Sequence, residues 1–140
     1  MKISGFSFVR NADTLYYPAV EMIQSILPIC HEFVIAVGRG DDGDRTREQI
    51  AALDDPRVRI IDTEWEEQYF KRGIINAMQT DIAMQQCSGD WLFYLQADEV
   101  VHERYLPVIE SRCAELLDDR RVDGLLFAYA DLEALPTTNT

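Results

Sequence analysis

Residues 88–99, with the sequence SGDWLFYLQADE, combine a turn, an apolar run and a group of acids. The first three residues predict a turn, and the unbroken apolar run Trp91–Leu95 predicts a strand buried on both faces of a parallel sheet. Gln96, Asp98 and Glu99 then follow at its carboxyl end, where open α/β sheets bind ligands. A carboxylate there can hold a divalent cation, which in turn binds a diphosphate. The alternative is that these acids only begin the next helix, whose dipole favours them.

The composition narrows the classes of partner. The 140 residues are the length of one domain, and 13 basic against 25 acidic side chains give a net charge of −12. This charge argues against nucleic acid and against an anionic membrane surface, while a phosphate-bearing ligand remains compatible if a metal supplies positive charge. No apolar run is long enough to cross a membrane. The three cysteines, Cys30, Cys87 and Cys113, lack zinc spacing and are predicted to be reduced thiols of a cytoplasmic protein.

Strand-like and helix-like segments alternate along the chain. The predicted strands are Ile3–Val9, Glu32–Val37, Val58–Asp62, Trp91–Leu95 and Val122–Tyr129. The predicted helices follow Pro18 and span Thr46–Leu53, Ile74–Cys87 and Glu103–Leu117, with Ile75, Met78 and Ile82 on the apolar stripe of the third. This alternation predicts an α/β fold, a three-layer sandwich whose mainly parallel central sheet has helices on both faces. Residues 1–130 form the predicted domain, and 131–140 a weakly ordered tail.

Several short motifs occur in a characteristic order. They are Phe8-Val9-Arg10-Asn11, Gly40-Asp41-Asp42-Gly43-Asp44, Arg72-Gly73 with Gln79-Thr80-Asp81-Ile82-Ala83, Ser88-Gly89-Asp90-Trp91, and Leu95-Gln96-Ala97-Asp98-Glu99. In this order they resemble the nucleotide-binding half of inverting family 2 glycosyltransferases, which have the GT-A fold. The resemblance covers roughly residues 3–130. The last motif is similar to the family's Leu-Asp-Ala-Asp-Asp, with Gln96 in place of its first Asp.

The resemblance implies a nucleotide-diphospho-sugar donor, a divalent cation (Mn²⁺ or Mg²⁺) held by Asp98, and an unknown acceptor. The residues it places at the donor are Phe8, Arg10, Asn11, Gly38, Asp42, Arg72, Gln96 and Asp98. Gln96 would hydrogen-bond the ribose, and the acid that the family often sets against the base would fall near Gly38. The family's catalytic base lies downstream of the metal motif, so we expect this chain to stop before the acceptor half. Asp131, after the last predicted strand, is the remaining candidate for the base.

Other interpretations stay open for individual residues. Asn11 also fits a strand-end turn, and Arg72 a solvated arginine at a helix start. His102 is four residues from Asp98, but a surface histidine is favoured over a metal ligand. Trp65 and Tyr69 can stack on a base or sugar, although anchoring in the core or a loop is favoured.

Three other functions compete with glycosyl transfer. Residues 38–43 spell Gly-x-Gly-x-x-Gly, the dinucleotide fingerprint, but its acids oppose a pyrophosphate and the following helix is short. A phosphorelay receiver domain is excluded because Arg10 and Asn11 stand where it needs acids. A non-catalytic nucleotide-sugar-binding fragment remains the main alternative.

Overall fold

Four parallel strands form one sheet, in the order β3-β2-β1-β4, with helices on both faces. The structure is a computed structural model that describes residues 1–127, apart from the side chain of Arg72. The strands are β1 (Ile3–Val9), β2 (Glu32–Gly38), β3 (Val58–Thr63) and β4 (Trp91–Tyr94). The α-helices are α1 (Ala19–Ile26), α2 (Thr46–Ala51), α3 (Ile74–Met84) and α4 (Leu106–Leu116). Short 3₁₀ helices span Leu27–Ile29, Glu67–Tyr69, Lys71–Gly73 and Glu103–Tyr105. The predicted α/β sandwich is confirmed.

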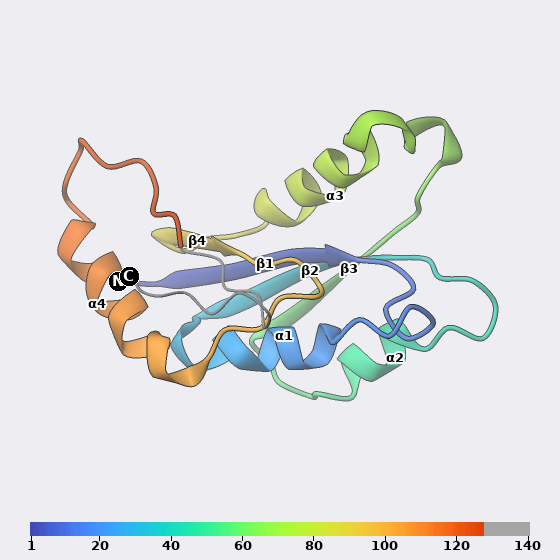
Figure 1. Ribbon diagram of the computed structural model, residues 1–140, viewed down its shortest axis with the longest axis horizontal. Coiled ribbons are helices and arrows are strands. Elements are labelled where there is room, and N and C mark those ends of the chain that lie inside the picture. The colour runs from blue at the N-terminus through green and yellow to red at the C-terminus, as the bar shows by residue number, and fades with distance from the viewer. Residues whose placement is uncertain (128–140) are drawn as a thin grey trace, which may run out of the picture.

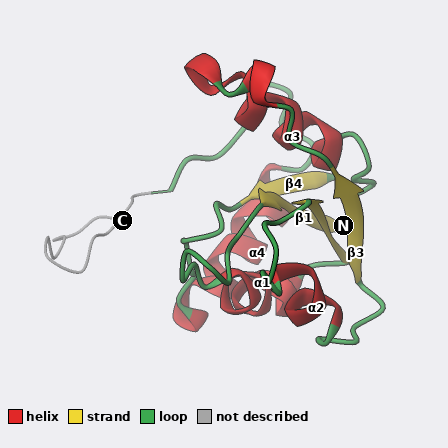
Figure 2. Cartoon of the chain, turned by 90° about the vertical axis from the view of Figure 1, so that its right-hand side faces the viewer, coloured by secondary structure: helices red, strands yellow, loops and turns green. Residues whose placement is uncertain are grey.

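The helices cover the sheet unequally. Helix α3 lies alone on one face, and α1, α2 and α4 lie on the other (Figure 1 and Figure 2). Strand β2 is buried along its whole length, because both faces of this inner strand are covered. Its residues Phe33 and Ile35 pack with Met22 and Ile23 of α1 in the larger core. Val34 faces the other way, into the smaller core under α3. Parallel strands buried in this manner read as continuous apolar runs, which is why the sequence predicts β2 well.

A buried carboxylate ties the amino ends of three strands together. Glu32 Oε2 accepts hydrogen bonds from Ser4 Oγ at 2.6 Å, from Ser88 N–H at 2.7 Å and from Ser88 Oγ at 2.8 Å. Its Oε1 accepts from Arg59 Nη1 at 3.1 Å. Burial raises the pKa of Glu32, but the hydrogen bonds from Ser4, Ser88 and Arg59 outweigh it and lower the pKa to about 2. The carboxylate therefore stays ionised, and it joins β1, β2, β3 and the turn that enters β4.

Strand β4 differs from its prediction. It lies at an edge of the sheet, pairing with β1 on one side. Only alternate residues are covered: Leu92 is 42% exposed and Tyr94 38%, while Trp91 and Phe93 pack against the larger core. The prediction of a strand buried on both faces is wrong, because α3 packs over β1 and β2 rather than over β4. An apolar run cannot by itself distinguish an inner strand from an edge strand.

Helix α3 also presents a different face to the sheet. The buried residues are Ile75, Gln79 and Ala83, at intervals of four, and Met78 is 37% exposed. The predicted stripe through Met78 is therefore wrong. Gln79 is tolerated inside because its Oε1 accepts a hydrogen bond from Thr63 Oγ1 at 2.6 Å, which satisfies the buried amide oxygen.

The described part of the predicted last strand does not form a strand. Residues 122–127 have no regular secondary structure, and 128–129 lie outside the described residues, as does the predicted tail 131–140. Phe127 instead packs on Phe93, with ring centroids 5.2 Å apart. In residues 1–127 there is no helix long and apolar enough to cross a membrane.

Candidate functional site

The chain turns at Asn11 where β1 ends. Its φ of 57° lies in the left-handed region, which Asn tolerates because its short side chain bonds nearby backbone. Asn11 Nδ2 donates to Asp41 Oδ2 at 3.1 Å, and Asn11 Oδ1 accepts from the Asp41 N–H at 2.9 Å. The strand-end turn predicted for Asn11 is confirmed. Its buried side chain also fixes the loop after β2 against the end of β1.

Arg10 makes a second link between these two strand ends. Its Nε donates to the Arg39 carbonyl at 2.9 Å, and its Nη2 donates to Asp41 Oδ1 at 3.0 Å. The guanidinium carbon lies 5.8 Å from the centroid of the Trp65 ring, within the range of a cation–π contact. Arg10 therefore holds a positive charge at the carboxyl edge of the sheet, between the loop after β2 and the loop after β3.

Backbone N–H groups at the end of the glycine- and acid-rich loop after β2 donate hydrogen bonds to carboxylates of the protein itself. Asp44 accepts from the Thr14 and Thr46 N–H groups, and the Arg45 N–H donates to Asp13. Burial raises the pKa of Asp44, but these hydrogen bonds from Thr46 and Thr14 lower it overall. A dinucleotide would need such amide donors for its pyrophosphate, and α2 has only six residues. The geometry of this loop gives the dinucleotide interpretation no support.

Gly38, at the end of β2, lies directly against the Trp65 indole. A Cβ atom at Gly38 would come within 2.6 Å of Trp65 Cδ1, so only glycine permits this approach. Phe8 and Phe70 flank the indole, with centroids 6.0 Å and 6.3 Å away. The packing role favoured for Trp65 by the sequence is confirmed. Trp65 Nε1 is the one buried side-chain polar atom without a hydrogen-bond partner in the described part of the chain.

Gln96 and Asp98 follow β4, next to the end of β1. The Gln96 N–H donates to Glu99 Oε1 at 2.7 Å, which fixes the turn. Ser7 Oγ donates to the Leu95 carbonyl and holds this strand end to β1. Asp98 lies exposed in the turn. Within residues 1–127 there is no group of three His, Cys, Asp or Glu side chains placed to hold a metal ion.

His102 has a local structural role. Its Nδ1 accepts a hydrogen bond from the Arg104 N–H at 3.1 Å and so caps the 3₁₀ helix that precedes α4. The imidazole is exposed. This agrees with the surface histidine favoured by the sequence over a metal ligand.

Three other residues were predicted to belong to the site: Asp42, Arg72 and Asp131. Asp42 is exposed in the turn after β2, and the backbone of Arg72 lies in the 3₁₀ helix before α3. Asp131 lies outside the described residues. Among the described side chains, no hydrogen bond or ion pair links Gln96 or Asp98 to the group around Asn11. The structure thus forms two clusters, one on β1 and β2 and one after β4.

Two surface hollows lie near α2. The larger, of about 540 Å³, is at the carboxyl ends of β2 and β3 and is lined by Gly38, Arg39, Arg47 and Asp62 among others. Arg47 there binds Asp62 through two hydrogen bonds, and the hydrogen bond from Arg47 lowers the pKa of Asp62. A volume of this size suits a small ligand.

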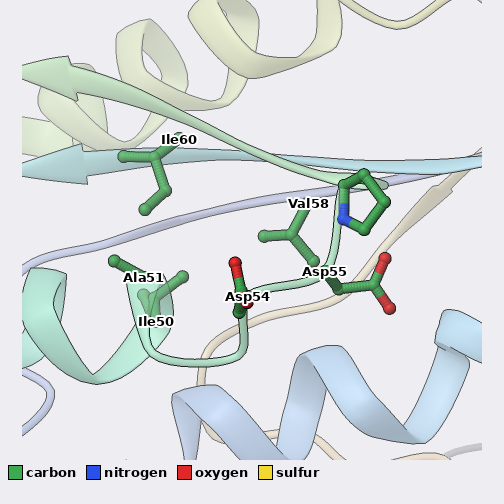
Figure 3. A pocket seen from close by; sticks show the side chains of 7 residues that line it. Ile50, Ala51, Asp54, Asp55, Val58 and Ile60 are labelled. Atoms are coloured by element: carbon green, nitrogen blue, oxygen red, sulfur yellow. The ribbon is translucent and has the colours of Figure 1, made fainter.

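The smaller hollow, of about 270 Å³, lies between the end of α2 and the start of β3 (Figure 3). It is lined by Ile50, Ala51, Asp54, Asp55, Pro56, Val58 and Ile60. Asp55 is already bound by Arg57, whose hydrogen bonds lower its pKa to about 2. This hollow is away from the carboxyl edge of the sheet, and we assign it no role in the site.

The arrangement of strands and helices is a GT-A-like α/β fold, and solved structures share it. TarS of S. aureus superposes with a TM-score of 0.61 at 14% identity, covering 82% of this chain and 20% of that one. TarS 1–349 gives a TM-score of 0.54 at 17% identity, and its complex with UDP-GlcNAc gives 0.55 at 18%. These two comparisons cover 82% of this chain and 33% and 32% of theirs. The chain therefore spans a fifth to a third of the matched chains. No known protein family matches the sequence, and no curated protein does either.

Sequence reasoning missed two features of this site. Asp41 joins Arg10 and Asn11, although only its neighbour Asp42 was predicted to take part. Trp65 fills the space over Gly38. The absence of a side chain at Gly38, where the resemblance leads one to expect an acid, is the sequence signal that another group occupies this position.

Proposed function

We propose that this chain is the donor-binding part of an inverting glycosyltransferase, which takes a nucleotide-diphospho-sugar and passes the sugar to an acceptor hydroxyl. The observation that carries the proposal is the meeting of three adjacent strand ends at one sheet edge. They bring Gly38, Asn11 and Asp98 to the position where open α/β sheets bind ligands. TarS, a glycosyltransferase, shares the fold, and one of its structures is a complex with UDP-GlcNAc.

The residues after β4 suit a hard divalent cation that needs only one or two protein carboxylates. Mg²⁺ and similar hard cations at nucleotide sites use one or two protein carboxylates and take their other ligands from phosphates and water. Asp98 is exposed and supplies such a carboxylate, while Glu99 is partly engaged by the Gln96 N–H. A bound Mn²⁺ or Mg²⁺ would supply Lewis-acid stabilisation of the departing diphosphate. Asp98 is therefore the proposed metal ligand, and the nucleotide is expected to complete the coordination.

The chain's own polar groups orient the rest of the donor. Gln96 carries both a donor and an acceptor that can bind a ribose hydroxyl. Arg10 offers a guanidinium at the same sheet edge, held in place by Asp41. Asn11 keeps the loop after β2 closed on β1, so that the floor of the proposed site is rigid before ligand arrives.

Calorimetry tests this proposal directly. UDP and UDP-GlcNAc are titrated into the 140-residue chain with and without Mn²⁺, and the titrations are repeated with Asp98→Asn. Loss of one hard anionic ligand should weaken Mn²⁺-dependent binding at least about tenfold, ~1.4 kcal/mol. Asp81→Asn, an exposed acid on α3, is the matched control and should bind as the parent does. Unchanged binding in Asp98→Asn would refute the metal assignment, and no binding of either nucleotide would refute the proposed function.

A second candidate function is nucleotide-sugar binding without transfer. It is favoured by the exposed positions of most described acids that follow Glu99, among them Glu110 and Glu115 on α4 and Asp118 beyond it. Transfer needs a base within hydrogen-bond reach of the acceptor hydroxyl. A donor-turnover assay with a mixed acceptor panel separates the two functions, since efficient transfer by this chain would exclude the binding-only function.

A further inference from the structure

The Trp65 indole occupies a notch at the carboxyl edge of the sheet. Gly38 forms the floor, Phe8 flanks the indole, and Arg10 lies over the ring at 5.8 Å. The notch lies over the ends of β1 and β2. An indole has two fused flat rings and is close in size to a nucleobase, so the notch is shaped for a flat aromatic group.

The indole is held there without a hydrogen bond. Trp65 Nε1 is buried and has no partner, whereas buried tryptophan N–H groups normally find one. Leaving a buried donor unpaired costs free energy that a change of position can recover. The other tryptophan of the chain provides a contrast, because Trp91 Nε1 donates to the Cys113 carbonyl at 2.9 Å. The Trp65 indole therefore fits the notch in shape, but the notch offers no hydrogen-bond acceptor to its Nε1–H group.

The segment that carries Trp65 is lightly anchored. It connects β3 to α3 through two 3₁₀ helices, Glu67–Tyr69 and Lys71–Gly73. Glu66, Glu67 and Gln68 are exposed, and Phe70, which packs edge-on against the indole, is 46% exposed. Few buried contacts oppose its movement, which is the character of segments that open locally.

We propose that Trp65 is a specificity-determining residue of the donor site, because its indole fills the nucleobase subsite in the ligand-free chain and the base of a bound nucleotide takes its place. This inference rests on the proposed function. Displacement frees the Trp65 N–H to reach water or the ligand and leaves Gly38, Phe8 and Arg10 as the surface that meets the base. The apparent affinity for a nucleotide is then reduced by the fraction of chains in which the indole is out of the notch.

Trp65→Ala and Trp65→Phe test the proposal by the sign of their effect. If about one chain in ten has the notch open, Trp65→Ala should bind UDP about tenfold more tightly than the parent, and Trp65→Phe should lie between them. Inorganic pyrophosphate, which lacks a base, should bind all three equally. Equal or weaker UDP binding by Trp65→Ala, with binding by the parent intact, would refute the inference and leave the proposed function standing. No UDP binding by any variant would refute both.

A fluorescence measurement covers the case in which Trp65→Ala does not fold. In Trp91→Phe, Trp65 is the single tryptophan of the chain. Saturation with UDP and Mn²⁺ should shift its emission to longer wavelength and increase quenching by acrylamide, because the indole leaves the notch for water. Pyrophosphate with Mn²⁺ should cause neither change. An unchanged or blue-shifted emission with UDP bound would overturn the proposal.

Discussion

Replacing Glu32 by Gln removes a charge and keeps the size of the side chain. In the native protein the carboxylate accepts four hydrogen bonds, three on one oxygen and one from Arg59 on the other. A glutamine has a single acceptor oxygen with two lone pairs. It cannot satisfy Ser4, Ser88 and Arg59 together, so at least one of these donors loses its partner.

The pKa of Glu32 gives the size of the effect. The pKa falls from an ordinary 4.5 to about 2 in the folded chain, which corresponds to ~3 kcal/mol of folding free energy at neutral pH. Because some hydrogen bonds survive in Glu32→Gln, we expect a loss of about 2 kcal/mol and a fall in Tm of roughly 5–10 °C. Urea unfolding followed by circular dichroism measures the change in unfolding free energy.

The pH dependence separates charge from packing. A carboxyl whose folded pKa is lowered contributes its full stabilisation above pH 4.5 and loses it as the pH falls towards about 2. The difference between the parent and Glu32→Gln should therefore be constant near neutrality and shrink between these two values. Glu115→Gln, which breaks an exposed pair with Arg112, is the control and should cost less than about 0.5 kcal/mol. A loss in Glu32→Gln no larger than in this control, or one that does not change with pH, would refute the reasoning.

Three further predictions concern the turn, the thiols and the glycine loop. Asn11→Ala should lower the unfolding free energy by about 2 kcal/mol, because it loses both hydrogen bonds to Asp41 and forces alanine into a left-handed backbone. Asn11→Gly should lower the unfolding free energy by less, because glycine tolerates that backbone. Equal losses in the two variants would contradict the strain assigned to the backbone. Burial raises the pKa of Cys87 to about 11, so its alkylation by iodoacetamide should accelerate up to that pH, and a rate that levels off below pH 9 would be inconsistent with this. Titration with NADH should give no change in its fluorescence, and micromolar binding would restore the dinucleotide interpretation of residues 38–43.

The sequence predicts the inner part of this fold well. Strand β1 has the predicted bounds Ile3–Val9, and β2 extends its prediction by one residue, to Gly38. These two inner strands lie at the centre of the sheet, where nearly every residue is buried. The turn at Asn11 was also predictable, because asparagine is one of the few residues that tolerate a left-handed backbone at a strand end. Local chemistry is sufficient in these cases.

The remainder depends on contacts between segments that are distant in sequence. Nothing in the run Trp91–Leu95 indicates that α3 leaves Leu92 and Tyr94 uncovered. The contact of Trp65 with Gly38 joins two loops, and the burial of Gln79 depends on a hydroxyl at the end of β3. Such contacts depend on how the elements pack against one another, and the periodicity of a single sequence does not reveal that packing.

The position of β4 has a consequence for how the protein behaves in concentrated solution. Along the described chain its outer side pairs with no strand, and it presents Leu92 and Tyr94 half exposed. A free edge with apolar side chains is a template for pairing between molecules. The net charge of −12 opposes this by mutual repulsion. Because salt screens that repulsion, the protein is expected to remain monodisperse in dilute buffer and to self-associate as ionic strength rises.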